Sequence, residues 1–538
     1  MYPNGPILFC AITTAVVRNM GEHMGSLTLL AAVIVIVRTG VLARLGAGCS
    51  EPLGNRANTW VRPYRGYGDS QVWFSLQPFY FCNQVGFCIK KDTILESQTK
   101  PFCMLNSYFA LSVNKTSIRT EILAGVSTFL ATMYIIVVNP AILSQTGMPF
   151  SGVLTATVVL SCFCSVMMGL YARNPIVVAP GMGLNAFFTF TVVKGMNVSY
   201  QTALGAVFWA GVVFLLLSVF NIRTYIVTAI PKQLRYAISA GICLFITFIG
   251  LVNAGFIVAN PATLVGIGNV TQPSHIIFLI GLMVTAVLVV RRIMGGIILG
   301  IIVVTLLAIS IGRWWGDAPV VVWRGLFSSP DFSLLLQLDF TGSLKLALLP
   351  VIFAFLFTDL FDSLSTFVGV AEAADLRDAS GEPRHVKQSL LTDAVATTLG
   401  GLLGTSPGTA YIESAVGVEQ GGRTGLTAVT AGLLFLPFMF FSPLLSVIPA
   451  IATAPALILV GVFMMKPVTR IRWTQLDDAI PAFLAMILIP LTYSITQGII
   501  WGFLSWTVIK LAVGKRHEVS ITLILIDLLA VTALVLGH

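Results

Sequence analysis

The fold is decided by two short stretches, APGMGLNAFF at 179–188 and GTSPGTAYIE at 404–413, each inside an otherwise apolar segment. Proline lacks an amide donor and glycine relaxes the backbone, so neither stretch favours an unbroken helix. Such backbone is tolerated at membrane depth only where protein or a wet cavity surrounds it. Interrupted segments at corresponding positions of two halves indicate a mid-membrane binding site of a transporter. Tight helix packing is the alternative, but it is less expected for a matched pair that carries Asn185 and Glu413.

The composition requires a bilayer as solvent. Of the 538 residues 56% are hydrophobic and 10% are charged, whereas soluble domains carry about a quarter charged residues. The net charge of +9 is scattered between apolar runs and forms no basic stripe, which argues against nucleic-acid binding. The eight cysteines show no pairing or metal-ligand spacing, so we interpret them as packing residues and expect no metal or cofactor.

Apolar runs of about 20 residues predict about fourteen spans in two sets of seven, divided by a polar-edged loop at 313–342. The first set is 122–143, 152–172, 179–193, 201–219, 235–257, 275–290 and 295–312. The second set is 344–368, 387–403, 408–418, 424–445, 452–466, 479–495 and 497–513. An odd number of spans per half makes the second half enter the membrane upside down. AGVVFL at 210–215 matches AGLLFL at 431–436, so we predict an all-α polytopic membrane protein with a 7+7 inverted repeat.

The ends of the chain differ from this region. Residues 1–104 are mixed in character, and we interpret them as an N-terminal extension of unknown role that the transporter does not need. The permease region is expected at 105–515. An apolar C-terminal tail follows at 516–538, in which 519–537 lies in the membrane interface or spans the membrane.

The distribution of basic residues predicts the orientation, because cytoplasmic loops carry an excess of Lys and Arg. With the residues before Ile122 inside, the outside segments hold little beyond Lys194, Arg313 and Arg324. The inside segments then hold Lys115, Arg119, Arg173, Arg223, Lys232, Arg235, Arg291, Arg292, Arg377, Arg384, Lys387, Arg423, Lys466, Arg470, Arg472, Lys515 and Arg516.

Acidic residues inside apolar spans mark the candidate site. Asp359 and Asp362 lie in LFTDLFDS at 356–363, and their i, i+3 spacing places both on one helix face. An aspartate at a helix centre costs about 2.5–3.5 kcal/mol on insertion scales, so both need partners or a function. Glu413 lies in the interrupted tenth span, and Asn185 has nearly the equivalent place in the third.

We hypothesise that the third and tenth spans face each other, with the eighth alongside, around a flat ligand with alternating donors and acceptors. A protonatable carboxylate there, Asp359 or Glu413, also gives a route for cation coupling. The predicted substrate-binding residues are Asn185, Asp359, Asp362, Gly408, Thr409, Ala410 and Glu413.

Structural roles for these groups stay open. Asp359 or Asp362 could fasten the eighth helix to a neighbour, and Glu413 could cap a half-helix. Four further acidic residues are interpreted as solvated groups in or near a cytoplasmic loop: Glu372, Asp375, Glu382 and Asp393. The five histidines lie in the extension, at span edges, in loops or at the terminus, so an enzyme is disfavoured.

At these residues the chain resembles the nucleobase–cation symporter-2 family, in particular its AzgA-like branch of adenine, guanine and hypoxanthine permeases. The resemblance covers about 105–515. The matching text is TEILAGVSTFLATMYIIVVNPAIL (120–143), NPIVVAPGMGLNAFFTF (174–190), FTDLFDSLSTFVGVAEAADL (357–376) and GTSPGTAYIESAVGVEQGGRTGLTAV (404–429).

The resemblance implies a core domain of spans 1–4 and 8–11 and a gate domain of spans 5–7 and 12–14, with a short strand in each of the third and tenth spans. It assigns substrate binding to Asn185, Asp359, Asp362 and Glu413. It further implies proton-coupled purine uptake through the cell membrane by an elevator-like motion, in a homodimer. Sodium coupling, a permease for uracil, xanthine or urate, and an anion transporter of the same fold are the alternatives.

Overall fold

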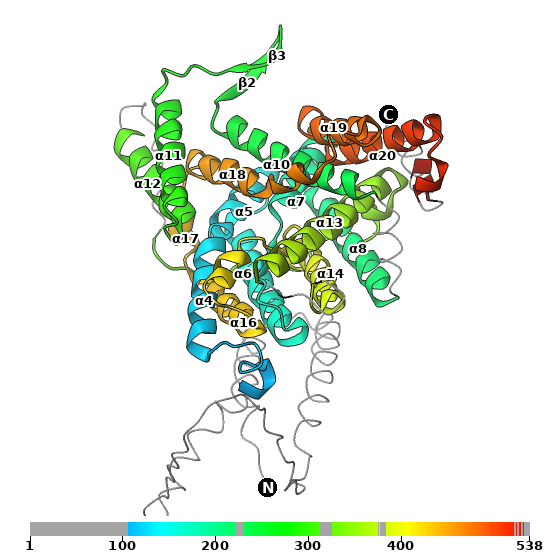
Figure 1. Ribbon diagram of the computed structural model, residues 1–538. Helices are drawn as coiled ribbons and strands as arrows, with labels where there is room; N and C mark the ends of the chain where they lie inside the picture. Colours follow the sequence, from blue (N-terminus) through cyan, green and yellow to red (C-terminus); the bar gives the residue numbers. More distant parts are fainter. Residues whose placement is uncertain are drawn as a thin grey trace, which may run out of the picture. The chain divides into compact units, whose positions relative to one another are not determined.

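Each range in which a span is expected contains a helical element in the computed structural model (Figure 1). The structure describes residues 106–220, 231–312, 325–374, 376 and 383–520, together with 523–524, 527–528 and 531. The predicted N-terminal extension, part of the 313–342 loop and most of the C-terminal tail therefore lie outside the described residues. The proposed boundaries near 104 and 515 stay predictions.

The first half contains α4 (Ile118–Thr132), α5 (Ile135–Leu143), η1 (Ser144–Thr146), α6 (Phe150–Met167), η2 (Met168–Ala172), α7 (Met182–Ala186), η3 (Phe187–Gly195), α8 (Tyr200–Val219), α10 (Lys232–Asn253), α11 (Pro273–Val290) and α12 (Gly296–Gly312). The second half contains η4 (Gly342–Leu344), η5 (Leu346–Leu348), α13 (Leu349–Ala374), α14 (Val386–Leu403), α15 (Ser414–Glu419), α16 (Gly425–Phe435), η6 (Leu436–Phe440), α17 (Ser442–Leu445), α18 (Ala450–Met464), η7 (Lys466–Arg470), α19 (Leu476–Leu491), α20 (Ile495–Ala512) and η8 (Arg516–Glu518).

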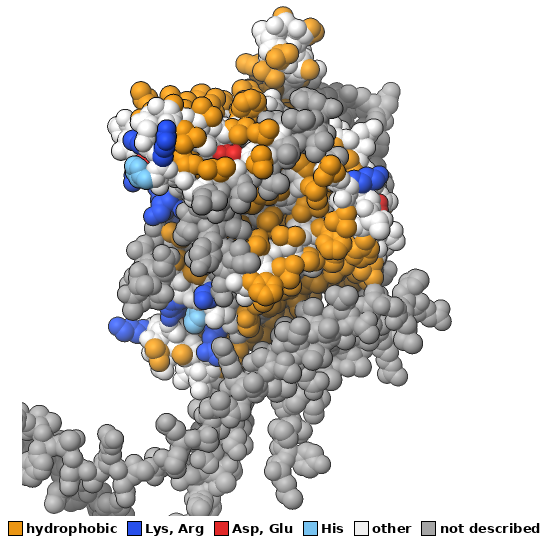
Figure 2. All heavy atoms as spheres, turned by 90° about the vertical axis from the view of Figure 1, so that its right-hand side faces the viewer, with side chains coloured by type: hydrophobic (Ala, Val, Ile, Leu, Met, Phe, Trp, Pro, Cys, Tyr) orange, Lys and Arg blue, Asp and Glu red, His pale blue; other side chains and the backbone are white. Residues whose placement is uncertain are grey.

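The helices are suited to a bilayer. Among the described residues, eight helical segments are long and apolar enough to cross a membrane, and two shorter apolar helices accompany them. Figure 2 shows hydrophobic side chains over much of one face, with Lys and Arg side chains mostly near its margins. Leu216, Met283 and Val462 are among the apolar side chains that point outward. This exposure is the arrangement expected of helices surrounded by lipid.

Helices of the two halves interlock in one group. α8 packs against α13 and α14, while α16 packs against α4 and α6. Glycine permits both close approaches: a Cβ on Gly211 of α8 would lie 2.4 Å from the backbone nitrogen of Thr398. A Cβ on Gly432 of α16 would lie 2.9 Å from Cβ of Ser165. Small residues let membrane helices approach at the backbone in this way.

A second group consists of α10, α11, α12, α18, α19 and α20. α10 packs against α18, α19 and α20, and α18 packs against α11 and α12 (Figure 1). Two pairs of helices that follow one another in the sequence also pack together: α11 with α12, and α19 with α20. These helices contact the first group through α10 on α7 and α13, through α20 on α13, and through smaller contacts of α18 with α5 and of α12 with α4.

A β-hairpin between α10 and α11 was not expected from the sequence, which placed the end of the fifth span at 257. β2 (Ile257–Asn260) pairs antiparallel with β3 (Leu264–Ile267), with Ile257 opposite Ile267. The helix ends at Asn253 because Gly255 adopts a φ of +71°. Oδ1 of Asn260 accepts a hydrogen bond from Ala262 N at 2.8 Å, which closes the turn.

Glu121 joins the first span to the eleventh. Its side chain is 0% exposed although α4 is a membrane helix. Oε1 accepts a hydrogen bond from Arg423 N at 2.9 Å, and Oε2 accepts one from Thr427 Oγ1 at 2.6 Å. The carboxylate therefore satisfies groups at the N-terminus of α16, where a negative charge is favoured.

Replacing Glu121 with Ala is expected to lower the thermal stability of the purified protein. The substitution leaves buried donors without an acceptor, which costs about 2 kcal/mol and corresponds to a Tm about 2 °C lower for a chain of this size. The exposed Glu419 provides the matched control, because Glu419→Ala removes a carboxylate from the surface. Equal Tm values for the two variants, measured in detergent, would contradict the capping role of Glu121.

Candidate functional site

The two interrupted stretches meet as a pair of short strands. β1 (Val178–Pro180) and β4 (Gly408–Ala410) run antiparallel, with Val178 opposite Ala410 and Pro180 opposite Gly408. The backbone pairing continues beyond the strands, because Gly181 N donates to Pro407 O at 2.9 Å. The structure thus has the short strands expected in the third and tenth spans and brings the two halves of the chain together at them.

Serine side chains satisfy backbone groups that a regular helix would have paired. Ser165 of α6 lies beside β1, where its Oγ accepts from Val178 N at 3.0 Å and donates to Val178 O at 3.1 Å. Ser363 of α13 lies beside β4, where its Oγ accepts from Ala410 N at 3.3 Å. Such partners are required because no water would reach these groups within the bilayer.

Asp362 and Glu413 lie near each other at the end of β4. Both are partly exposed, and they are close enough for an electrostatic interaction between their carboxylates. Oδ2 of Asp362 accepts a hydrogen bond from Thr409 Oγ1 at 3.4 Å, and Oε1 of Glu413 accepts one from Tyr134 OH at 2.6 Å. These two carboxylates are therefore the predicted acidic groups that the structure brings together.

Asp359 has different neighbours from Asp362, although we expected the two side chains to share a face. Asp359 is 0% exposed, and its Oδ2 accepts a hydrogen bond from Thr397 Oγ1 of α14. The same Oγ1 lies 3.2 Å from the carbonyl oxygen of Gly408 in β4. Within the described part of the chain, Oδ1 of Asp359 has no hydrogen-bond partner. Asp359 thus lies behind the strand, toward α14, and contacts the site through Thr397.

The interpretation of Asp393 as a solvated loop residue is wrong. Asp393 lies in α14 and is 0% exposed. It interacts electrostatically with Asp359, so α13 and α14 bring two buried carboxylates near each other. A helix was correctly expected at 387–403, but its sequence has no distinct apolar face and so did not indicate that Asp393 points inward. The side chains of Glu372, Asp375 and Glu382 lie outside the described residues.

Asn185 of α7 is enclosed by the loop that precedes β4. Its side chain is 0% exposed, and its Oδ1 accepts a hydrogen bond from Ser406 Oγ. Nearby, Nδ2 of Asn139 donates to Thr405 Oγ1 at 2.9 Å and to Thr157 Oγ1 at 2.7 Å. Side-chain amides of the first and third spans therefore bind the hydroxyl groups of Thr405 and Ser406.

Three residues near the carboxylates had not been predicted. Tyr134 belongs to the first span, and Tyr411, directly after β4, donates its hydroxyl to the carbonyl of Pro180 in β1. Cys243 of α10 lies close enough to Asp362 for an electrostatic interaction, so α10 covers the site from the second helix group. Tyr134 and Tyr411 carry hydroxyl groups within apolar segments, and a buried hydroxyl needs a partner, so the sequence could have marked both residues as candidates.

A surface hollow separates the two helix groups away from the carboxylates. It has a volume of about 440 Å³ and is lined by Ala141, Ser144, Gln145 and Phe150 on one side. Residues of the second group and of the segment between α17 and α18 line the other side: Asn253, Ser446, Ile448 and Ala450. The hollow opens where the predicted orientation places the outside of the membrane.

Apolar helices of spanning length, with two interrupted spans that pair through short strands and have carboxylates nearby, define a multi-pass membrane transporter. The family model Xan_ur_permease, described as "Permease family", matches residues 119–500. The chain belongs to this permease family, which is not a family of enzymes, and the resemblance seen in the sequence is confirmed.

Two curated relatives illustrate the match. The adenine permease AdeP of Escherichia coli K12 is 43% identical over 441 residues, which is 82% of this chain and 98% of the relative. The guanine/hypoxanthine permease PbuO of Bacillus subtilis 168 is 43% identical over 420 residues, covering 76% of this chain and 96% of the relative.

Solved structures show the same fold at low sequence identity. The transmembrane domain of the cyanobacterial bicarbonate transporter BicA superposes with a TM-score of 0.55 at 16% identity, covering 71% of this chain and 96% of that one. SLC26A9 superposes with a TM-score of 0.54 at 11% identity, covering 80% of this chain and 72% of that one.

Proposed function

We propose that this protein imports purine nucleobases, namely adenine, guanine and hypoxanthine, together with a proton. The observation that carries the substrate class is the identity of 43%, over nearly the full length of each relative, to an adenine permease and a guanine/hypoxanthine permease. Coupling to a proton is supported by three acidic residues near the paired strands β1 and β4, namely Asp359, Asp362 and Glu413.

The chemistry of the site suits a neutral, flat base. Purines present ring N–H groups beside acceptor nitrogens, and a carboxylate offers two acceptor oxygens to such an edge. Asp362 and Glu413 are partly exposed, and the Thr409 hydroxyl lies 3.4 Å from the former. An anion such as bicarbonate would be repelled by this pair of carboxylates. The acidic site therefore favours a nucleobase over the anions carried by transporters of similar fold.

The 7+7 inverted repeat that we propose has support from equivalent helix contacts in the two halves. Spans 4 and 11 correspond, and α8 packs on α13 and α14 as α16 packs on α4 and α6. In the second group, the contact of α10 with α19 corresponds to that of α18 with α11. The contact of α10 with α20 likewise corresponds to that of α18 with α12. Two halves with one fold and opposite orientation would produce these paired contacts.

The transport motion that we propose is an elevator-like movement of a core against a gate. The core would be α4–α8 and α13–α16, which contain both strands and all predicted site residues. The gate would be α10–α12 and α18–α20, whose helices pack mainly on one another. Moving the core would carry the complete site past α10. Assembly as a homodimer stays a prediction, which mass determination of the detergent-solubilised protein would test.

Uptake of labelled adenine, guanine and hypoxanthine by cells that lack their own purine permeases tests the function. We expect accumulation that a protonophore abolishes and that replacement of sodium leaves unchanged. Unlabelled uracil, xanthine and urate are expected to compete poorly. Uptake of bicarbonate without uptake of any purine would contradict the proposal. Purine uptake that requires sodium would show that sodium, and not a proton, is the coupling ion.

Replacing Asp359 with Asn is expected to abolish net purine accumulation while the protein still inserts in the membrane. Asn keeps the size of the side chain and can still pair with Thr397, but it cannot exchange a proton. Purine counterflow, in which labelled base exchanges for unlabelled base without a proton gradient, should persist. Accumulation equal to that of the wild type would remove Asp359 from the coupling mechanism.

A further inference from the structure

Tyr134 lies where the first span breaks, between the end of α4 at Thr132 and the start of α5 at Ile135. Its side chain is 1% exposed although it carries a hydroxyl. A buried hydroxyl without a partner is costly, and this one donates to Oε1 of Glu413 at 2.6 Å. The break in the first span therefore supplies a hydrogen-bond donor to the acidic residue of the tenth.

The hydrogen bond occupies one side of the Glu413 carboxylate. Among the described residues, Tyr134 is the one side chain that hydrogen-bonds this carboxylate, which also accepts from the backbone amide of Glu413, and the Glu413 side chain is partly exposed where Tyr134 is not. The phenol thus holds the carboxylate from its buried side. A hydrogen bond to a carboxylate is short and strong, so it restricts the rotamers of Glu413. Restricting them before the ligand arrives reduces the entropy lost on binding.

The hydrogen bond from Tyr134 also opposes the repulsion between Glu413 and Asp362. Asp362 and Tyr411 both interact electrostatically with Tyr134, so the hydroxyl lies among the same groups that face Glu413. Two neighbouring carboxylates repel, and a free Glu413 side chain would turn away from Asp362. A donor fixed on the first span keeps Glu413 in place against that repulsion.

We propose that Tyr134 is a positioning residue for purine binding: its hydroxyl holds Oε1 of Glu413 so that Oε2 faces an N–H group of the base. The inference rests on the proposed function, since it assigns a role toward the same ligand. It predicts that the hydroxyl acts on the affinity for the base. The rate of the transport cycle depends on moving the core and is expected to change little.

The test is Tyr134→Phe, which keeps the ring and removes only the hydroxyl. Initial uptake of labelled adenine, guanine and hypoxanthine is measured over a range of concentrations for this variant and the wild type. We expect KM for the transported purine to rise about tenfold, since a hydrogen bond to a charged group is lost, with Vmax per transporter within about twofold of the wild type. Tyr171→Phe provides the control, because Tyr171 is a half-buried tyrosine of η2 outside the site.

Reduced insertion of the variant does not obscure the result, because KM does not depend on the number of transporters in the membrane. An unchanged KM in Tyr134→Phe, beside a wild type that imports purines, overturns the role of Tyr134 and leaves the proposed function intact. A fall in Vmax at unchanged KM overturns it equally. A wild type that imports none of the three bases overturns the proposed function and this inference together.

Discussion

Replacing Glu413 with Gln is expected to reduce purine uptake at least about 100-fold at an unchanged amount of protein in the membrane, because a site built to hydrogen-bond a ligand discriminates strongly when a partner is lost. Glutamine keeps the length of the side chain but replaces an acceptor oxygen with an NH2 group. That group would meet the N–H donors of the base and the hydroxyl of Tyr134, which donates to Glu413 at 2.6 Å. The measurement is initial uptake of labelled adenine, guanine and hypoxanthine in whole cells.

The chain offers a matched control on the same short helix. Glu419 ends α15 and is exposed, while Glu413 immediately precedes that helix and lies near Asp362. Glu419→Gln makes the same chemical change and is expected to leave uptake within about twofold, as for most surface substitutions. Uptake by Glu413→Gln above half of the wild-type value would show that the carboxylate does not bind the base. Equal losses in both variants would point to α15 as a whole.

The features that sequence could supply are those encoded in short stretches of chain. The interruptions at Pro180 and Pro407 predicted where helices must break, and the structure has β1 and β4 beside them. The lengths of the apolar segments predicted the positions of the helices to within a few residues, because each span must cross a similar thickness of bilayer. The β2–β3 hairpin escaped prediction because Ile257 and Val258 are apolar enough to read as the end of α10.

Contacts across the fold could not be predicted in the same way. The i, i+3 spacing places Asp359 and Asp362 on nearby positions of one helix, yet Asp359 accepts a hydrogen bond from Thr397 of α14 and Asp362 accepts one from Thr409 of β4. Each partner lies more than 30 residues away, and the rotation of α13 about its axis decides which carboxylate faces the site. Periodicity within one helix carries no information about that rotation.

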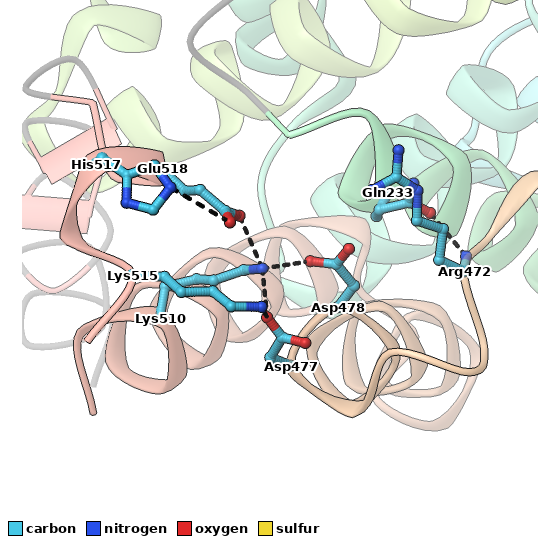
Figure 3. Close-up of polar contacts among 8 residues, drawn as sticks. All are labelled: Gln233, Arg472, Asp477, Asp478, Lys510, Lys515, His517 and Glu518. Atoms are coloured by element: carbon cyan, nitrogen blue, oxygen red, sulfur yellow. Dashed lines mark hydrogen bonds and ion pairs between the residues drawn. The ribbon is translucent and has the colours of Figure 1, made fainter. Parts of the chain in front are cut away.

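A cluster of charges at the ends of α19 and α20 gives the second large effect (Figure 3). Lys510 of α20 has a side chain that is 1% exposed, and its Nζ lies 2.7 Å from Asp477, 2.7 Å from Asp478 and 2.8 Å from Glu518. Lys515 adds a contact of 2.6 Å to Asp477. Hydrogen bonds from Lys510 and Lys515 lower the pKa of Asp477 to about 2, so this carboxylate stays charged at physiological pH.

Replacing Lys510 with Met is therefore expected to destabilise the protein far more than replacing Lys515 with Met. Methionine fills the volume of the lysine stem but leaves three carboxylates without their shared cation, and breaking a buried pair in this way costs about 3 kcal/mol or more. For a chain of this size that loss corresponds to a Tm lower by about 3 °C, measured on the purified protein in detergent. The Lys515 side chain is 39% exposed and contacts only Asp477 among these acids, so its replacement is expected to change the Tm by less than about 1 °C.

A second substitution separates charge from packing as the cause of this loss. In Lys510→Met the three carboxylates lose their shared cation and repel one another, so adding Asp478→Asn removes one of three negative charges and is expected to recover part of the Tm. In the wild-type background Asp478→Asn removes a partner of Lys510, which lies 2.7 Å away, and should lower the Tm. The same substitution would thus stabilise one background and destabilise the other. A loss in both backgrounds would mean that the side chain of Lys510 acts through its packing on Trp506, whose ring centroid lies 5.3 Å from Nζ, and that its charge is secondary.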